Sequence, residues 1–166
     1  MPRKLAIFIP LLVVGLVLDQ VTKLLVLFKL PLGRQVPLIP GLLNLVHIHN
    51  KGAAFGLLSG WSAEFAWLFF VATTGLVLGV LGYLWWRLPD DHWPAALGYS
   101  LILTGALGNM IDRVRLGEVV DFIDVYWGRY HWPAFNVADS LVVVGTAILV
   151  WVIIRDEKTA DASDPV

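Results

Sequence analysis

The sequence predicts an all-α membrane protein in which four transmembrane helices form a bundle. Composition is the first reason: the chain of 166 residues is 58% hydrophobic and 15% charged, whereas a soluble domain carries roughly 25% charged residues. Segment length is the second reason, because four apolar segments approach the ~20 residues that cross ~30 Å of hydrocarbon. These segments are residues 5–28, 62–86, 94–111 and 135–154.

Composition also excludes several kinds of chemistry. The chain has no cysteine, so disulfides, thiolate nucleophiles, cysteine-ligated zinc and iron–sulfur clusters are ruled out. The formal net charge of −1 gives no reason to expect nucleic acid as a partner. We expect no cofactor and no metal.

The first apolar segment begins like a secretory signal peptide, with basic residues at Arg3 and Lys4. The segment continues past Asp19 and Lys23 to Phe28, and no small-x-small cleavage motif follows it. We therefore expect an uncleaved first span.

The connections between the spans set the topology. Residues 87–93 form a short turn, whereas residues 29–61 and 112–133 form two longer connections. Two spans separate the longer connections, so both lie on one side of the membrane and both termini lie on the other. We expect a single four-helix domain over residues 1–155, followed by a polar, disordered tail at 156–166.

Each longer connection has its own expected role. Residues 35–40 and 42–50 alternate loosely in polarity around the turn residues Pro40 and Gly41, which predicts a small antiparallel sheet over the membrane face. The second connection is expected to be a loop over the same face. Tryptophans near the segment ends suggest anchors at the membrane interface. They are Trp61, Trp85, Trp86, Trp93 and Trp132.

Polar residues gather at one end of the predicted bundle. They lie in the second half of the first span, at the end of the third span and at the start of the fourth, which is one face of an up-down-up-down bundle. Ionisable residues at a membrane span are costly and are usually functional. The polar residues are Asp19, Gln20, Lys23, Asn109, Asp112, Arg113, Asn136, Asp139 and Ser140. We expect one site at one membrane face.

Two aspartates are the candidate catalytic residues, Asp121 in the second longer connection and Asp139 at the start of the fourth span. Two converging carboxyl groups can share one proton and activate water. Asp112 and Asp124 lie near Asp121, and chemistry alone does not rank the three. Apolar neighbours favour Asp121; Asp124 is interpreted as a loop or interfacial charge.

Helix capping offers a second explanation for Asp139. The spacing Asn136-x-x-Asp139 before an apolar run is also typical of a helix N-terminus with an acidic third residue. Asp112 likewise has a local explanation, as a helix-end residue that pairs with Arg113 or Arg115.

The remaining polar residues are expected to support the site. Asn109 and Arg113 are four residues apart and share a helix face, where they would orient the substrate backbone, although Arg113 is also suited to lipid headgroups. Asp19 and Lys23 have the same spacing and predict an intrahelical ion pair.

Asn50 and Gly52 follow the predicted sheet. Asn50 is either a substrate-backbone ligand or a turn residue, and Gly52 allows the backbone to approach a ligand closely.

Two further patterns have structural explanations. Gly75 and Gly79 form a GxxxG motif that we attribute to close packing inside the bundle. His47 and His49 share one face of a strand, but this spacing does not by itself predict a metal site, and the sequence has no His-Glu-x-x-His motif.

Five motifs in a fixed order give the chain a family resemblance. They are Asp19-Gln-Val-Thr-Lys23, Asn50-Lys-Gly-Ala-Ala-Phe55, Gly105-Ala-Leu-Gly-Asn-Met-Ile-Asp-Arg113, Val119-Val-Asp-Phe122 and Phe135-Asn-Val-Ala-Asp-Ser140. With these motifs and its four-span layout, the whole chain resembles bacterial lipoprotein signal peptidases, the signal peptidase II family.

This resemblance implies an aspartic endopeptidase that removes signal peptides from bacterial prolipoproteins. The family cuts on the N-terminal side of a diacylglyceryl-modified cysteine, and its catalytic pair matches Asp121 and Asp139. Its supporting residues match Asp19, Lys23, Asn50, Asn109, Arg113 and Asn136. The resemblance also places the protein in the bacterial inner membrane, with both termini cytoplasmic and the site near the periplasmic leaflet. We expect a monomer whose partners are lipid-modified prolipoproteins and membrane lipids.

Two other classes of function compete with the peptidase. A small proton-coupled transporter uses intramembrane carboxylates too, but its relay would place ionisable groups through the full depth of the membrane. A non-enzymatic scaffold leaves the cost of the membrane aspartates unexplained.

Overall fold

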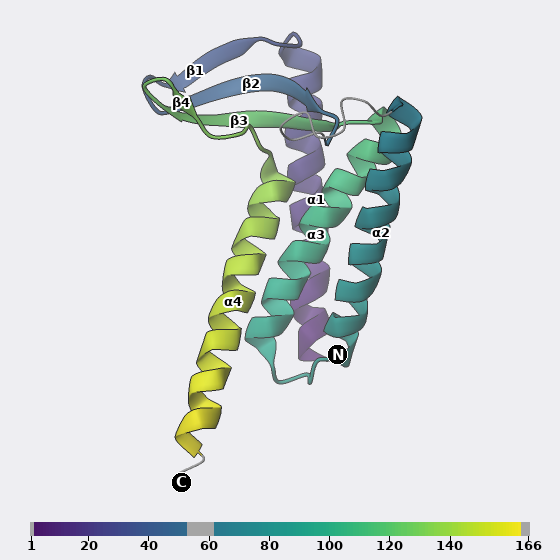
Figure 1. Cartoon of the computed structure of the whole chain (residues 1–166), viewed down its shortest axis with the longest axis vertical. Helices are drawn as coiled ribbons and strands as arrows, with labels where there is room; N and C mark the ends of the chain where they lie inside the picture. Colours follow the sequence, from purple (N-terminus) through teal and green to yellow (C-terminus); the bar gives the residue numbers. More distant parts are fainter. Residues whose placement is uncertain (1, 53–61, 164–166) are drawn as a thin grey trace.

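The computed structural model describes residues 2–52 and 62–163 and confirms the predicted fold class. Within these residues, four helices are long and apolar enough to cross a membrane. They are α1 (Arg3–Lys29), α2 (Ala63–Arg87), α3 (Trp93–Leu116) and α4 (Val137–Ser163). Both termini lie at the end of the bundle opposite the sheet (Figure 1). Trp61 and the motif residues 53–55 lie outside the described residues.

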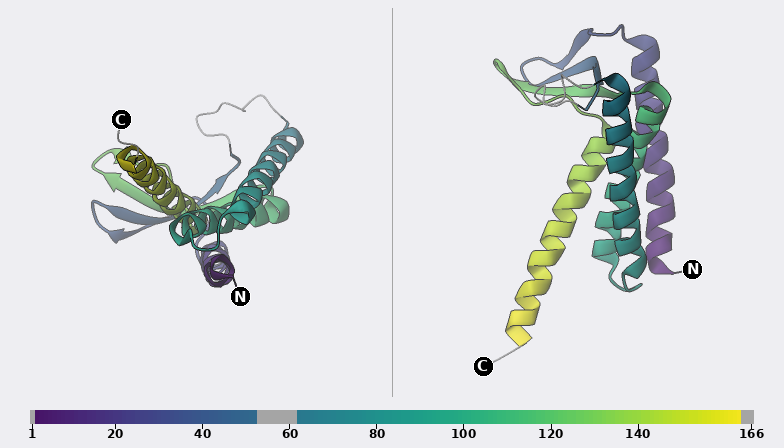
Figure 2. Two further views of the ribbon diagram at one scale, coloured as in Figure 1. Left: turned by 90° about the horizontal axis from the view of Figure 1, so that it is seen from below. Right: turned by 45° about the vertical axis from the view of Figure 1, so that its right-hand side comes forward.

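Helix α3 is the centre of the bundle. In its apolar window 61% of the residues are buried, compared with none in α2 and 17% in α4. Seen along the bundle, α1, α2 and α4 surround α3 (Figure 2). The other three helices therefore present most of their apolar surface to the surroundings, as helices in lipid do.

Glycines let α3 approach its neighbours closely, which is how helices associate in a membrane. A Cβ atom on Gly105 would overlap the backbone carbonyl of Ala138 in α4, and a Cβ on Gly108 would lie 2.7 Å from the Asp19 carboxylate. The prediction for the GxxxG motif of α2 is wrong: a Cβ on Gly79 meets nothing within 4 Å, and one on Gly75 meets only the end of Met110. Tight packing involves α3 instead.

A four-stranded antiparallel sheet lies across one end of the bundle (Figure 1). Its strands follow the order β1 (Gln35–Ile39), β2 (Leu43–Asn50), β3 (Val119–Trp127) and β4 (Tyr130–His131). The second longer connection therefore supplies two strands and is more than a loop. Strand β3 was not predicted because it is internal to the sheet and buried at its first four residues. It therefore lacks the alternation of polar and apolar residues that marks a half-exposed strand.

Two helices extend beyond the predicted spans. Helix α3 ends at Leu116, where Gly117 adopts a left-handed conformation with φ 78° and its N–H binds the carbonyl of Arg113. Helix α4 continues to Ser163, so most of the segment expected to be a disordered tail extends this helix.

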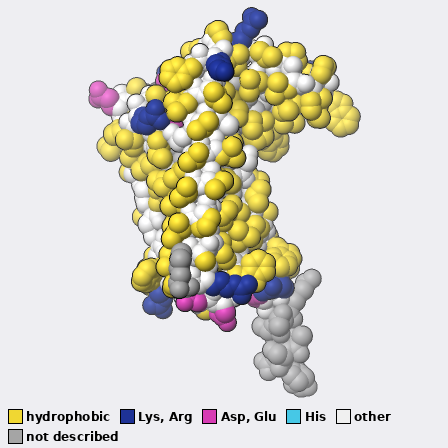
Figure 3. Space-filling model, turned by 180° about the vertical axis from the view of Figure 1, so that it is seen from behind, with side chains coloured by type: hydrophobic (Ala, Val, Ile, Leu, Met, Phe, Trp, Pro, Cys, Tyr) yellow, Lys and Arg dark blue, Asp and Glu magenta, His cyan; other side chains and the backbone are white. Residues whose placement is uncertain are grey.

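The bundle has an apolar surface with charged residues near its ends (Figure 3). Of the predicted tryptophan anchors, Trp86, Trp93 and Trp132 are exposed. Trp85 is buried, contrary to prediction, because it packs against Phe8, with ring centroids 4.9 Å apart, and lies beneath Lys4.

A methyl group on the packed face of α3 should loosen the bundle. We expect Gly105→Ala to lower the free energy of unfolding by about 1–3 kcal/mol, because α4 must move away from the added carbon. Gly79→Ala is the matched control, since open space surrounds its Cβ position, and it should unfold like the wild type. Thermal unfolding of both variants in detergent measures the difference, and equal stability of the two would contradict this account of the packing.

Candidate active site

The two candidate aspartates belong to different elements that meet where the sheet joins the bundle. Asp121 lies in β3, and Asp139 lies in the first turn of α4. Backbone hydrogen bonds between Phe135 and Ile123 hold the start of α4 against β3. The fold thus brings both carboxyl groups to the same end of the molecule.

Asn136 connects the two aspartates. Its side-chain Nδ2 donates to Asp121 Oδ1 at 2.8 Å, and its backbone N–H donates to Asp139 Oδ2 at 3.1 Å. Its Oδ1 accepts the backbone N–H of Asp139 at 2.9 Å. Asn136 itself is fully buried, so these bonds fix one geometry for the pair.

The bonds between Asn136 and Asp139 form the reciprocal pattern of a capping box. The capping explanation of Asp139 therefore describes its backbone correctly. Capping uses only one oxygen of the Asp139 carboxylate. The other oxygen, Oδ1, accepts a hydrogen bond from Asn109 Nδ2 at 2.7 Å. Capping and membership of the polar site occur together.

Asp121 is 2% exposed, although it lies in a connection outside the spans. Burial is the main reason that the pKa of Asp121 is raised to about 6, and the nearby charge of Asp139 acts in the same direction, while hydrogen bonds from Asn50 and Asn136 and the charge of Lys23 oppose the shift. Asn50 Nδ2 donates to Asp121 Oδ2 at 3.0 Å, and Asn50 Oδ1 accepts the N–H of Gly52. Asn50 is therefore both a turn residue and a partner of the candidate site.

A buried ion cluster in α1 and α3 supports the pair Asp121 and Asp139. Lys23 is 1% exposed, and its Nζ contacts Asp19 Oδ2 at 2.9 Å and Asp112 Oδ2 at 2.8 Å, and donates to Asn109 Oδ1 at 3.0 Å. The predicted ion pair between Asp19 and Lys23 is confirmed. Asp112 does not pair with Arg113 or Arg115 as expected, since its side chain turns inward to the lysine.

The two carboxylates of this cluster also bind the backbone next to the candidate catalytic residues. Asp112 Oδ2 accepts the N–H of Val120, the residue before Asp121, at 3.2 Å. Asp19 Oδ1 accepts the N–H of Ala138, the residue before Asp139, at 2.9 Å. One buried cation thereby anchors both segments that carry an aspartate.

Gln20, one of the polar residues expected at this end of the bundle, had no role predicted from the sequence. Its Nε2 donates to Asp19 Oδ2 at 3.1 Å and to Asp112 Oδ1 at 3.0 Å, and its Oε1 accepts from Arg115 at 3.0 Å. Its place between Asp19 and Lys23 in the first motif was the available signal.

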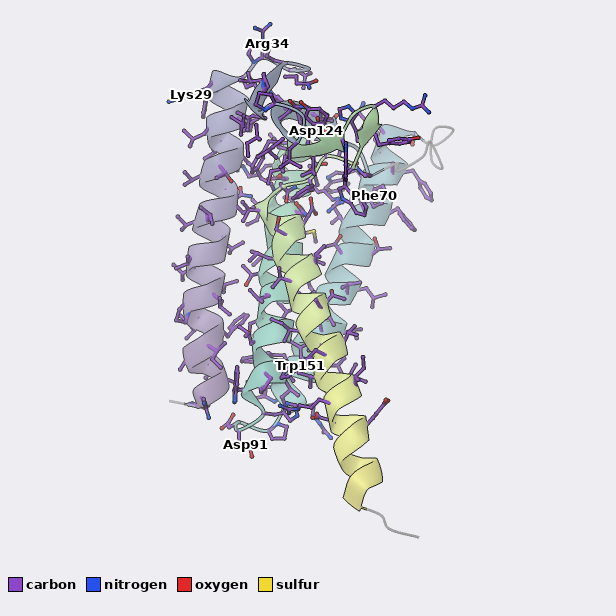
Figure 4. All side chains as sticks on the ribbon, turned by 90° about the vertical axis from the view of Figure 1, so that its left-hand side faces the viewer. Lys29, Arg34, Phe70, Asp91, Asp124 and Trp151 are labelled. Atoms are coloured by element: carbon purple, nitrogen blue, oxygen red, sulfur yellow. The ribbon has the colours of Figure 1, made fainter. Side chains whose placement is uncertain are left out.

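Arg113 is half-buried, and its charge lies within electrostatic reach of Asp139 and Asp121. Its guanidinium carbon is 5.4 Å from the ring centroid of Phe70 in α2, a cation–π distance. The same ring fills the space next to Gly52, where φ is 84°. Figure 4 labels Phe70 on α2 just below the sheet. Sequence reasoning missed Phe70, because one aromatic residue in an apolar span carries no signal.

Asp124 is buried in the sheet, so its interpretation as an interfacial charge is wrong. Its carboxylate accepts from Asn44 at 2.8 Å and contacts His131 Nδ1 at 2.8 Å. These partners hold β2, β3 and β4 together away from the Asp121–Asp139 pair. Among the described residues, no group of three or more His, Asp or Glu side chains suits a metal ion.

A four-helix membrane bundle with a buried acidic site beside a small sheet is the architecture of a small membrane-embedded enzyme. Two solved structures titled as a bacterial membrane enzyme share this architecture. One has a TM-score of 0.83 and 35% sequence identity, covering 94% of this chain and 99% of that chain. The other has a TM-score of 0.81 and 36% identity, covering 91% of this chain and 89% of that chain.

The sequence comparisons are more specific. The family described as Signal peptidase (SPase) II matches residues 11–155. A lipoprotein signal peptidase of Geobacter metallireducens is 50% identical, covering 87% of this chain and 88% of that protein. A lipoprotein signal peptidase of Geobacter sulfurreducens is 49% identical, covering 87% of this chain and 89% of that protein. The chain belongs to the signal peptidase II family, as its motifs predicted, and is therefore a protease of the bacterial membrane.

The raised pKa of Asp121 has a measurable consequence for stability. Because the folded protein holds the Asp121 proton more tightly than the unfolded chain, this residue stabilises the fold below pH ~4 and loses that contribution as pH rises through about 6. The change is a few kcal/mol at most, from about 1.4 kcal/mol per pKa unit. Unfolding of Asp121→Asn in detergent should lack this component between pH 4 and 7.

The control for this measurement is Asp91→Asn, which removes an exposed carboxylate from the turn between α2 and α3. It should keep the pH dependence of the wild type. The same pH dependence in Asp121→Asn and in the wild type would show that Asp121 has no raised pKa.

Removing the buried cation should cost more than removing an exposed one. We expect Lys23→Met to lower the free energy of unfolding by about 3–5 kcal/mol, since two buried carboxylates lose their counter-charge. Lys29→Met, at the exposed end of the same helix, is the control and should change stability by less than about 0.5 kcal/mol. Chemical or thermal unfolding compares the two, and a tolerant Lys23 would remove it from the support of the site.

Proposed function

We propose that this protein removes signal peptides from bacterial prolipoproteins, cutting before a diacylglyceryl-modified cysteine with Asp121 and Asp139 as its catalytic pair. The observation that supports this most directly is the bridge through Asn136, which joins two carboxyl groups at the edge of the membrane bundle. The lipoprotein signal peptidases among its relatives supply the substrate class.

The surroundings of Asp139 suit a substrate that approaches within the membrane. A pocket of about 400 Å³ opens beside Asp139 and Ser140 and is lined by Trp132, Phe135, Val143 and Val144. Val143 and Val144 are exposed on α4, so the pocket faces the hydrocarbon. An apolar signal-peptide segment or an acyl chain can lie there while the peptide bond meets the aspartates.

The proposed reaction is acid–base catalysis without a covalent intermediate. We assign the shared proton to Asp121, because burial raises its pKa, and we assign to Asp139 the role of the base that takes a proton from water. The hydroxide attacks the scissile carbonyl carbon, and Asp121 protonates the carbonyl oxygen. Asp139 then gives its proton to the leaving amine as the C–N bond breaks, and Asp121 recovers its proton when the carboxylic acid product forms.

The neighbouring residues have positioning roles in this proposal. Asn109 is oriented by Lys23, which occupies its oxygen and leaves its Nδ2 for Asp139. Asn50 orients Asp121 from the end of β2. Arg113 supplies positive charge near both carboxyl groups, where the substrate backbone and the developing oxyanion would lie.

We further propose that the protein lies in the inner membrane with the sheet end at the periplasmic leaflet and both termini in the cytoplasm, and that residues 1–155 form the working unit. A proton-coupled transporter is less well supported. The buried carboxylates Asp19, Asp112 and Asp121 all lie at the sheet end of the bundle, and such a relay would need ionisable groups across the bundle.

Replacing either aspartate by its amide should abolish cleavage. Asp121→Asn and Asp139→Asn keep the size of the side chain but cannot move a proton, and we expect each to lower the cleavage rate about 100-fold to 10,000-fold. The assay follows a diacylglyceryl-modified prolipoprotein with purified protein in liposomes. Binding of the uncleaved substrate should persist in both variants.

Two controls separate this pair from the other acidic residues. Asp124→Asn removes the rival carboxylate of β3, and Asp91→Asn removes the exposed carboxylate labelled in Figure 4. Both should retain cleavage within about tenfold of wild type. Full activity of a folded Asp121→Asn or Asp139→Asn protein would remove that residue from the mechanism.

A further inference from the structure

Two histidines outside the candidate active site converge at the surface of the sheet. In β2, His47 Nε2 and His49 Nε2 lie 3.0 Å apart. The rings are tilted by 50° with centroids 5.0 Å apart, so their nitrogen atoms meet and their faces do not stack. An alternating strand places residues i and i+2 on one face, which explains why the side chains are neighbours.

The other ring nitrogen of each histidine, Nδ1, contacts an oxygen atom of the protein. His47 Nδ1 lies 2.7 Å from the backbone carbonyl of Leu30, and His49 Nδ1 lies 3.3 Å from a carboxylate oxygen of Glu118. The carbonyl of Leu30 only accepts hydrogen bonds, so His47 Nδ1 carries the hydrogen and His47 Nε2 is a lone-pair acceptor in the neutral ring. When His49 carries its hydrogen on Nδ1, beside Glu118, both Nε2 atoms present lone pairs to the same space.

Without a ligand, an Nε2–H of His49 that donates to His47 satisfies this contact. The outer contacts are also those of metal-binding histidines, whose second ring nitrogen faces a carboxylate or a backbone carbonyl. The spacing is also suitable. Two nitrogens at about 2.0–2.1 Å from a metal are about 2.9 Å apart when they subtend 90°, and about 3.4 Å apart in a tetrahedral site.

We propose that His47 and His49 bind a divalent metal ion of tetragonal preference, with Cu²⁺ bound most tightly. The separation of 3.0 Å lets both nitrogens occupy adjacent positions around a tetragonal ion. Imidazole ligands and the general order of divalent affinities both favour Cu²⁺. With two protein ligands in the described part of the chain, water completes the coordination.

The site is accessible and held in place. A surface pocket of about 460 Å³ is lined by both histidines and Glu118. The backbone of His47 is fixed by hydrogen bonds with Gly33 and Arg34, and the His47 ring by Leu30. Lys51 reaches only the other oxygen of Glu118, at 3.6 Å, and its side chain is 72% exposed, so it can move away from an incoming cation.

Titration with CuCl₂ tests the proposal on the full chain purified without a polyhistidine tag. We expect one equivalent of Cu²⁺ to bind in calorimetry at neutral pH, with Zn²⁺ weaker. Electron paramagnetic resonance of the Cu²⁺ protein should show hyperfine coupling to two imidazole nitrogens.

Matched variants locate the site. His47→Gln and His49→Gln should each weaken Cu²⁺ binding at least tenfold, and Glu118→Gln about tenfold through the lost N–H partner of His49. His92→Gln, at the opposite end of the bundle, should bind like the wild type. Retained thermal unfolding shows that a variant is folded.

Two results would overturn the proposal. One is a wild type without saturable Cu²⁺ binding, which would leave a hydrogen bond between the two Nε2 atoms as the whole interaction. The other is binding that is equal in wild type, His47→Gln and His49→Gln, which would place the ion elsewhere. The spectrum of the wild type decides between two histidine ligands and none, even where a variant does not fold.

Discussion

Burial of one lysine among acidic side chains is the constraint on which the rest of the site depends. Lys23 needs a counter-charge inside a membrane bundle, because an unpaired buried cation costs several kcal/mol. It therefore draws Asp19 of its own helix and Asp112 of α3 to itself, together with the oxygen of Asn109. Those partners in turn bind the backbone before Asp121 and before Asp139. Removing the charge would release two segments at once.

Close helix packing is the second condition for this arrangement. Asp19 reaches the start of α4 only because Gly108 leaves room for its carboxylate between α1 and α3. Gly105 brings the first turn of α4 against α3, which places Asp139 within reach of Asn109. Small residues at these positions thus have a chemical consequence, since they set where the polar atoms meet.

Much of the fold and part of the site could be predicted from sequence. Long apolar segments and the polarity of their ends gave the four helices and the common end of Asp19, Asn109 and Asp139. The intrahelical pair of Asp19 with Lys23 followed from helical spacing, since both residues lie on one element. The family followed from the motifs, and the comparisons confirmed it.

Contacts between distant elements could not be predicted in the same way. Strand β3 has no alternation because it is internal to the sheet, and the inward turn of Asp112 depends on the lysine of another helix. Phe70 approaches Arg113 from α2, and no local pattern encodes that approach. Asn136 is a special case: its capping role was visible in the sequence, whereas its bond to Asp121 depends on the position of β3.

The double role of Asn136 has a consequence for the newly made chain. As the N-terminal cap of α4, it reaches its place only when the last helix forms, and only then can it join the carboxyl group of Asp121 to that of Asp139. A ribosome makes this helix after every other element described above. A half-inserted chain therefore holds its two carboxyl groups apart, and the proposed catalytic pair exists only once the start of α4 has packed against β3.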